Sequence, residues 1–171
     1  GVDMKIRFKG DVQQQDVRAA LVKGGLADAA VVAYEGPKGA SDYSIKLKAR
    51  KGQDDKEASV QFDRIKAILK GLDPQNADPR KDLNTAAALE LLDQWMKDNP
   101  LGVAGDEVAL RGTYEPIAEK VIRARETFSP MTSFDQLPKD LPPQLRSGIE
   151  KSYRLGPMVV LKNESFSPAI S

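Results

Sequence analysis

Asp, Glu, Lys and Tyr are the residues of this chain that are suited to acid–base chemistry, because its 171 residues include no histidine and no cysteine. Imidazole and thiolate are the common zinc ligands, and they are also common nucleophiles or bases in hydrolases. We therefore predict neither a zinc site of the usual kind nor a Ser-His-Asp or cysteine-based catalytic site. The acidic group Asp54, Asp55 and Glu57 has the ligand type of a hard cation site. Its flanking lysines favour a solvated loop at a helix start instead.

A second set of carboxylates lies among cations: Glu115, Glu119 and Glu126 alternate with Lys120, Arg123 and Arg125. This spacing is typical of ion pairs on a helix surface rather than of a catalytic carboxylate dyad. We therefore predict that the chain is not an enzyme and has no metal or cofactor site.

The net charge of +1 hides an uneven distribution. Residues 1–72 hold 14 basic and 10 acidic side chains, whereas residues 73–155 hold 11 and 14. Alternation predicts that the basic residues of two strands share one sheet face: Lys5, Arg7, Lys9, Lys46, Lys48 and Arg50. This face has three interpretations: a solvated surface, a docking site for the acidic part of the chain, or a site for lipid headgroups or nucleic acid. Nucleic acid is disfavoured because Phe8 and Tyr43 have the opposite parity, so no aromatic stacking platform is predicted.

The elements that position these residues follow from periodicity. Strands are predicted at 4–8, 29–34, 43–49 and 158–161, and helices after an Asp11 N-cap and over 57–70. This order predicts an α+β, ferredoxin-like split β-α-β-β-α-β sandwich whose first and last strands are neighbours. Residues 1–72 and 156–171 would form this domain. Residues 73–155 would be a helical insertion between the second helix and the last strand.

Within the insertion, caps and prolines predict helix boundaries. Asp82 is the predicted cap of a helix that ends at Asn99, and Thr113 of a second helix with Pro116 in its first turn. Ser133 with Gln136 resembles a short capped turn, and Pro142-Pro143 opens a last helix. The stretch 121–137 loosely resembles helix-hairpin-helix repeats, which contact protein as well as DNA.

Four segments of the first third, taken in order, resemble one family: Met4–Phe8, Asp16–Leu21, Gly25–Val32 and Tyr43–Leu47. They resemble the first periplasmic region of SecF, the membrane subunit that partners SecD in bacterial protein export. Phe166, Ser167 and Pro168 stand where the family has Val-Gly-Pro before its next membrane helix. The helical insertion is not part of the common family pattern.

The resemblance implies a periplasmic segment of a bacterial inner-membrane protein, joined to membrane helices outside this chain. Its parent would work with SecD and the SecYEG channel, using the proton gradient to move a translocating polypeptide. The outer edge strand would be the one containing Val31, Val32 and Tyr34, and it could bind an extended chain by strand addition. The alternatives are a soluble ferredoxin-like ligand-binding or regulatory module, and a nucleic-acid adaptor that uses the insertion.

Overall fold

The computed structural model describes residues 1–49 and 55–166, and the chain is of the α+β class. It divides into two compact units, each with its own hydrophobic core. Unit 1 is Gly1–Ala77 with Pro157–Ser171, and unit 2 is Asp78–Gly156. No helix within the described ranges is long and apolar enough to cross a membrane.

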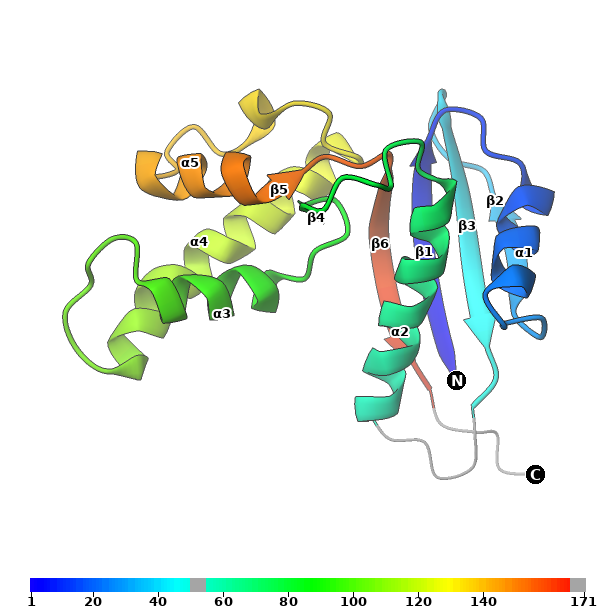
Figure 1. Cartoon of the computed structure of the whole chain (residues 1–171), viewed down its shortest axis with the longest axis horizontal. Helices are drawn as coiled ribbons and strands as arrows, with labels where there is room; N and C mark the ends of the chain where they lie inside the picture. The colour runs from blue at the N-terminus through cyan, green and yellow to red at the C-terminus, as the bar shows by residue number, and fades with distance from the viewer. Residues whose placement is uncertain (50–54, 167–171) are drawn as a thin grey trace. The chain divides into compact units, whose positions relative to one another are not determined.

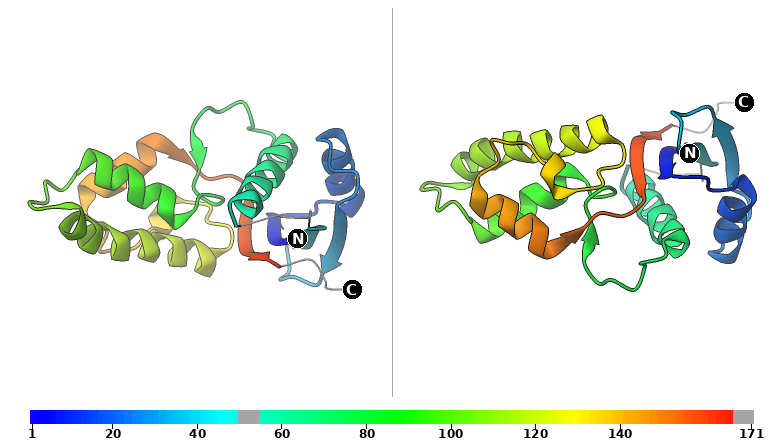
Figure 2. Two further views of the ribbon diagram at one scale, coloured as in Figure 1. Left: turned by 90° about the horizontal axis from the view of Figure 1, so that it is seen from below. Right: turned by 90° about the horizontal axis from the view of Figure 1, so that it is seen from above.

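Unit 1 is a four-stranded antiparallel sheet with two helices on one face (Figures 1 and 2). Its strands are β1 (Val2–Lys9), β2 (Ala30–Tyr34), β3 (Ala40–Leu47) and β6 (Met158–Ser165), in the order β2-β3-β1-β6. Its helices are α1 (Gln14–Lys23), α2 (Asp55–Leu69) and the short η1 (Lys70–Leu72). Phe8 pairs with Met158 and Ile6 with Val160, which confirms the predicted pairing of the first and last strands.

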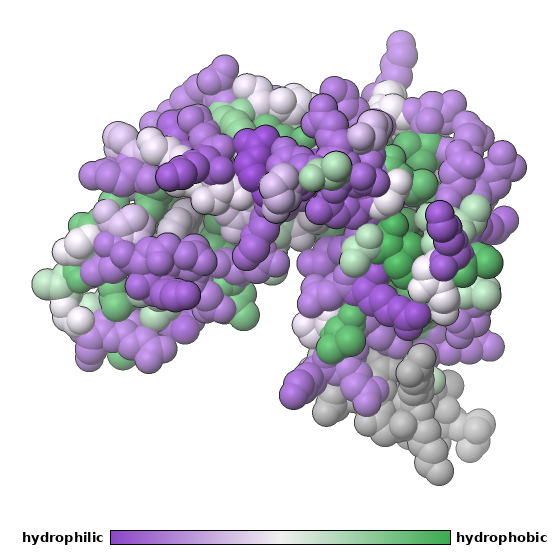
Figure 3. Space-filling model, in the orientation of Figure 1, coloured by the Kyte–Doolittle hydropathy of each residue, from purple (hydrophilic) through white to green (hydrophobic). Residues whose placement is uncertain are grey.

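The core of unit 1 follows the period of two. Met4, Ile6 and Phe8 are buried beneath the helices, whereas Lys5 and Arg7 lie on the opposite face. A groove of about 750 Å³ lies between α1 and the end of α2, lined by Val12, Ala20, Ile68 and other residues of these elements. Figure 3 shows hydrophobic atoms on this helical side of the unit.

Unit 2 is mainly helical. It contains β4 (Lys81–Asp82), α3 (Ala88–Asp98), α4 (Glu107–Phe128), η2 (Phe134–Gln136), α5 (Pro143–Ser152) and β5 (Tyr153–Arg154). β4 and β5 pair in parallel, so the two ends of the unit are tied together. Its core includes Leu91, Trp95, Tyr114, Val121 and Leu145.

Several predicted helix ends are confirmed. Asn99 ends α3 in the left-handed conformation, with φ 45°. Ser133 and Gln136 form a capping box around η2, and α5 begins at Pro143.

Three predicted caps are wrong. Asp11 accepts a hydrogen bond from Gln13 Nε2 at 2.9 Å rather than capping α1, which begins at Gln14. Asp82 lies in β4, well before α3. Thr113 lies inside α4, because Asp106 caps that helix through Ala109 N–H and the helix continues through Pro116.

Candidate binding surface

The open face of the unit 1 sheet carries the charged residues of β1 and their partners on β3 and β6. The strand register places Asp3 opposite Lys46 and Glu164, and Lys5 opposite Ser44 and Lys162. Arg7 lies opposite Asp42. Carboxylates are therefore interleaved with the cations that the sequence predicted on this face.

Arg7 and Asp42 form a bidentate ion pair on this face. Arg7 Nε donates to Asp42 Oδ1 at 2.8 Å, and Arg7 Nη2 donates to Asp42 Oδ2 at 3.0 Å. This bidentate hydrogen bonding raises the pKa of the Arg7 guanidinium. Beside it, buried Ser44 donates from its hydroxyl to Asp3, and Lys162 pairs with Glu164 at 2.5 Å. Much of the positive charge is thus neutralised within the face.

The remaining predicted basic residues are placed differently. Lys46 lies on the face and is exposed, and Lys9 lies at the end of β1 opposite Ala40. Lys48 is exposed just beyond the end of β3, and Arg50 lies outside the described residues. The open face is a mixed-charge surface with exposed lysines toward its ends, which does not favour a polyanion along its centre.

Strand β2 is an outer strand of the sheet, and its side chains divide between the two faces. Val31 is buried in the core, whereas Val32 and Tyr34 are 40% and 46% exposed on the open face. Lys5 Nζ lies 5.6 Å from the centre of the Tyr34 ring, within the range of a cation–π contact. Sequence reasoning did not place this aromatic ring on the charged face, although strict alternation with buried Val31 puts Tyr34 on the same face as Val32.

The outer edge of β2 is partly covered by side chains of α1. Gln14 Nε2 donates to the Val31 carbonyl at 2.8 Å, and Arg18 Nη2 donates to the same oxygen at 3.3 Å. Because backbone groups alternate between the two sides of a strand, Ala33 is the other residue of β2 whose amide and carbonyl face outward. Strand addition at this edge would therefore displace the two side chains or begin at Ala33.

The start of β1 and the end of β6 lie side by side. The amino group of Gly1 donates to the Phe166 carbonyl at 2.6 Å, and Phe166 N–H donates to the Gly1 carbonyl at 2.8 Å. Phe166 is half exposed, and Ser167 and Pro168 lie outside the described residues. Gly1 and Phe166 therefore lie next to each other at one end of the sheet.

The loop between α3 and α4, residues 99–106, has little capacity to bind a phosphate. Gly102 and Gly105 have positive φ, but Asp106 occupies the helix N-terminus through its bond to Ala109 N–H at 3.1 Å, and Glu107 follows it. Across the described ranges, 1–49 and 55–166, no group of carboxylates is arranged to hold a metal ion. Asp54, which sequence reasoning grouped with Asp55 and Glu57 as a candidate cation site, lies outside the described residues.

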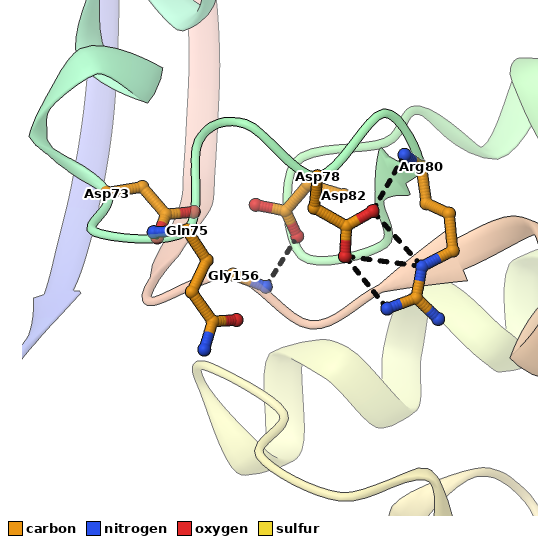
Figure 4. A network of polar contacts seen from close by, with 6 residues as sticks. All are labelled: Asp73, Gln75, Asp78, Arg80, Asp82 and Gly156. Atoms are coloured by element: carbon orange, nitrogen blue, oxygen red, sulfur yellow. Dashed lines mark hydrogen bonds and ion pairs between the residues drawn. The ribbon is translucent and has the colours of Figure 1, made fainter.

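Unit 2 contains buried polar residues that sequence reasoning missed. Asn84 is fully buried and bonds to the main chain of Met131 and Gly156. Arg125, expected on a helix surface, is instead buried and donates to the carbonyls of Leu83 and Ala86. Its burial lowers the pKa of the guanidinium. Figure 4 shows Asp82 directed at Gly156 N–H, at 3.0 Å, and Asp78 paired with Arg80.

The chain is similar to a curated protein, the protein translocase subunit SecF of Koribacter versatilis (strain Ellin345). The two are 28% identical over 163 residues, which cover 90% of this chain and 38% of that protein. The resemblance predicted from the sequence is confirmed. No protein-family model matches the chain, and no solved structure matches it.

The match extends into the helical insertion. Unit 1 spans little more than half of the chain, so a match over 90% of it includes most of unit 2. The helical part therefore aligns with this SecF as well.

Proposed function

We propose that this chain is a non-enzymatic, periplasmic part of a SecF-like subunit of the bacterial inner membrane that assists protein export. The single observation that carries the proposal is the match to the protein translocase subunit SecF, which extends over both units. The chain spans 38% of that protein, so the export activity would belong to a larger molecule. In this proposal SecD, the SecYEG channel and a translocating polypeptide are its partners.

We also propose that unit 1 has the ferredoxin-like split β-α-β-β-α-β arrangement, with unit 2 inserted between α2 and β6. The strand order β2-β3-β1-β6 and the two helices on one face support this assignment. Unit 1 and unit 2 would then be a sandwich domain and a helical subdomain of one periplasmic segment.

The paired ends of unit 1 suit a domain carried between membrane segments. Gly1 and Phe166 are held together by two hydrogen bonds, and β1 is a central strand of the sheet. Movement of flanking segments would therefore reach the middle of the sheet directly. This arrangement supports a role in conformational coupling, with the proton-carrying chemistry placed outside this chain.

Contact with the translocating chain is proposed at Val32, Ala33 and Tyr34. Val32 and Tyr34 offer exposed apolar surface on an outer strand, and Ala33 offers outward backbone groups. Lys5 beside the Tyr34 ring adds a cation to the same surface.

The test uses the full-length membrane protein with a photo-crosslinking residue at Tyr34 and, as a control, at Val60, which is 61% exposed on α2. During arrested translocation, we expect Tyr34 to crosslink to the precursor or to SecD and Val60 to give at least fivefold less product. The proposal fails if neither partner is captured and deletion of residues 1–166 leaves the rate of precursor export unchanged.

A further inference from the structure

A groove of about 530 Å³ lies within unit 2 between α3 and α5, beside the paired strands β4 and β5. Figure 1 shows α3 and α5 on the two sides of α4. The apolar lining includes Leu91 and Trp95 of α3, Leu145 and Ile149 of α5, and Tyr153 of β5. Its volume is in the range of about 300–1,000 Å³ that is usual for ligand sites.

Gly148 lines this groove from the middle of α5, where the fold gives no reason for a glycine. Its φ is not positive, and a Cβ placed there would meet nothing within 4 Å. Glycine inside a helix lowers stability relative to alanine, so the helix alone would favour a side chain. The effect of the glycine is to leave the helix backbone bare at the groove wall.

The length and polarity of the groove suit an extended peptide. Leu91 and Asp98 are seven helical steps apart in α3, or about 10 Å, which matches about three residues of extended chain. Gln94 and Gln144 also line it. Gln94 Nε2 donates to the Asp98 carboxylate, and the Gln144 amide has both the donor and the acceptor that a peptide backbone needs.

Opposite charges mark the two ends of the groove. Lys81 is exposed beside Tyr153, after the end of α5, whereas Asp98 lies in the last turn of α3. Arg80 also lines the groove, but Asp78 holds it in an ion pair at 2.8 Å, so among the described residues at this end Lys81 is the cation that we assign to a ligand. The charge pattern favours an apolar segment with acidic and basic residues on either side.

We propose that this groove binds a short apolar segment of extended polypeptide, with Gly148 allowing close approach of the bound chain. The choice of a translocating polypeptide as its source rests on the proposed function. The site is separate from Val32 and Tyr34, which lie in unit 1. It assigns unit 2 a binding role of its own.

The test compares Gly148, which lines the groove, with a second helical glycine that does not line it. Gly112, in α4, is also an exposed glycine inside a helix with nothing within 4 Å of an added Cβ. The probe is a fluorescein-labelled nonapeptide with a Leu-Val-Leu centre and Glu and Lys flanks, made in both orders, and a matched peptide with serines at the centre. Binding to the 171-residue chain is followed by anisotropy and by the emission of Trp95, the single tryptophan.

We expect at least one charge order of the leucine peptide to bind, and the serine peptide to bind at least tenfold more weakly. Gly148→Leu should weaken binding at least tenfold, whereas Gly112→Leu should leave it within twofold. Equal binding by the two variants, or no binding of any leucine peptide, would overturn the proposal. A chain that dimerises until Gly148→Leu is introduced would assign the groove to a second copy instead.

Failure of the groove proposal can be distinguished from failure of the proposed export function. The peptide titration needs only the purified chain, whereas the export role is tested in membranes by crosslinking at Tyr34. A chain that binds peptide through the groove but has no effect on export would refute the proposed function alone.

Discussion

Asn84 and Met131 are joined by two hydrogen bonds inside unit 2: Met131 N–H donates to Asn84 Oδ1 at 2.9 Å, and Asn84 Nδ2 donates to the Met131 carbonyl at 2.9 Å. Asn84 Nδ2 also donates to the Gly156 carbonyl at 2.7 Å. One buried amide therefore connects the segment after β4, the loop after α4 and the end of unit 2. The helices of this unit are held in place by polar contacts as well as by the apolar core.

Replacing Asn84 should strongly destabilise unit 2. Asn84→Ala leaves one amide and two carbonyls without their partner in a buried site, and each such group costs about 1–3 kcal/mol. We expect a loss of about 3 kcal/mol or more, measured by urea unfolding, with hydrogen exchange faster in unit 2 than in unit 1. Asn163→Ala, at an exposed position of β6, should change stability by less than about 0.5 kcal/mol. Equal effects of the two substitutions would contradict this role of Asn84.

Gly156 and Asp82 are too close for a larger residue to replace the glycine. A Cβ on Gly156 would lie 2.0 Å from Asp82 Oδ2, while Gly156 N–H donates to Asp82 Oδ1. Gly156→Ala should therefore destabilise unit 2 by about 1–3 kcal/mol through overpacking. Gly112→Ala is the matched control, because its Cβ would meet open space, and it should stabilise α4 by up to about 1 kcal/mol. Thermal unfolding of both variants checks the opposite signs.

The sheet of unit 1 was predictable because its signal is local. Met4, Ile6 and Phe8 alternate with charged residues, and this period fixes which face is buried. The same rule placed Lys5, Arg7 and Lys46 on one face. The alternation rule did not predict the acidic partners of these cations. Asp42 contacts Arg7 because of the register between β1 and β3, which the local pattern does not determine.

Unit 2 was less predictable because its polar contacts join distant residues. Arg125 has the spacing of a surface ion-pair residue, yet its carbonyl partners Leu83 and Ala86 come from a segment about forty residues earlier. Pro116 suggested a helix start because proline favours the first turn. The true cap, Asp106, lies ten residues earlier, directly after the positive-φ Gly105.

The side chains of Gln14 and Arg18 should protect the β2 edge from pairing with other chains. Both donate to the Val31 carbonyl, which would otherwise be an open acceptor on an outer strand. The double variant Gln14→Ala, Arg18→Ala should self-associate more strongly than the native chain. We expect its association constant, measured by sedimentation equilibrium, to be at least fivefold higher. Gln15→Ala with Lys23→Ala, on exposed positions of the same helix, is the control. A double variant that stays as monomeric as this control would show that the two side chains do not guard the edge.

Tyr153 should make the stability of unit 2 depend on pH in the alkaline range. Burial of its ring, with a smaller effect of Glu90, raises the pKa of its hydroxyl from 10.0 to about 12. Since the folded state favours the neutral form, this stabilisation is complete below pH 10 and is lost as the pH rises from 10 toward 12. A shift of two units corresponds to about 3 kcal/mol.

The measurement compares urea unfolding of the native chain and of Tyr153→Phe between pH 9 and pH 12. The native chain should lose stability relative to the phenylalanine variant by up to about 3 kcal/mol over this interval, because only the native chain gains a tyrosinate at position 153 on unfolding, while the other three tyrosines are common to both proteins. Absorbance at 295 nm, taken as the difference between the two proteins, should show Tyr153 ionising near pH 12. Ionisation near pH 10 in the folded chain, with parallel stability curves, would mean that the Tyr153 hydroxyl is open to water.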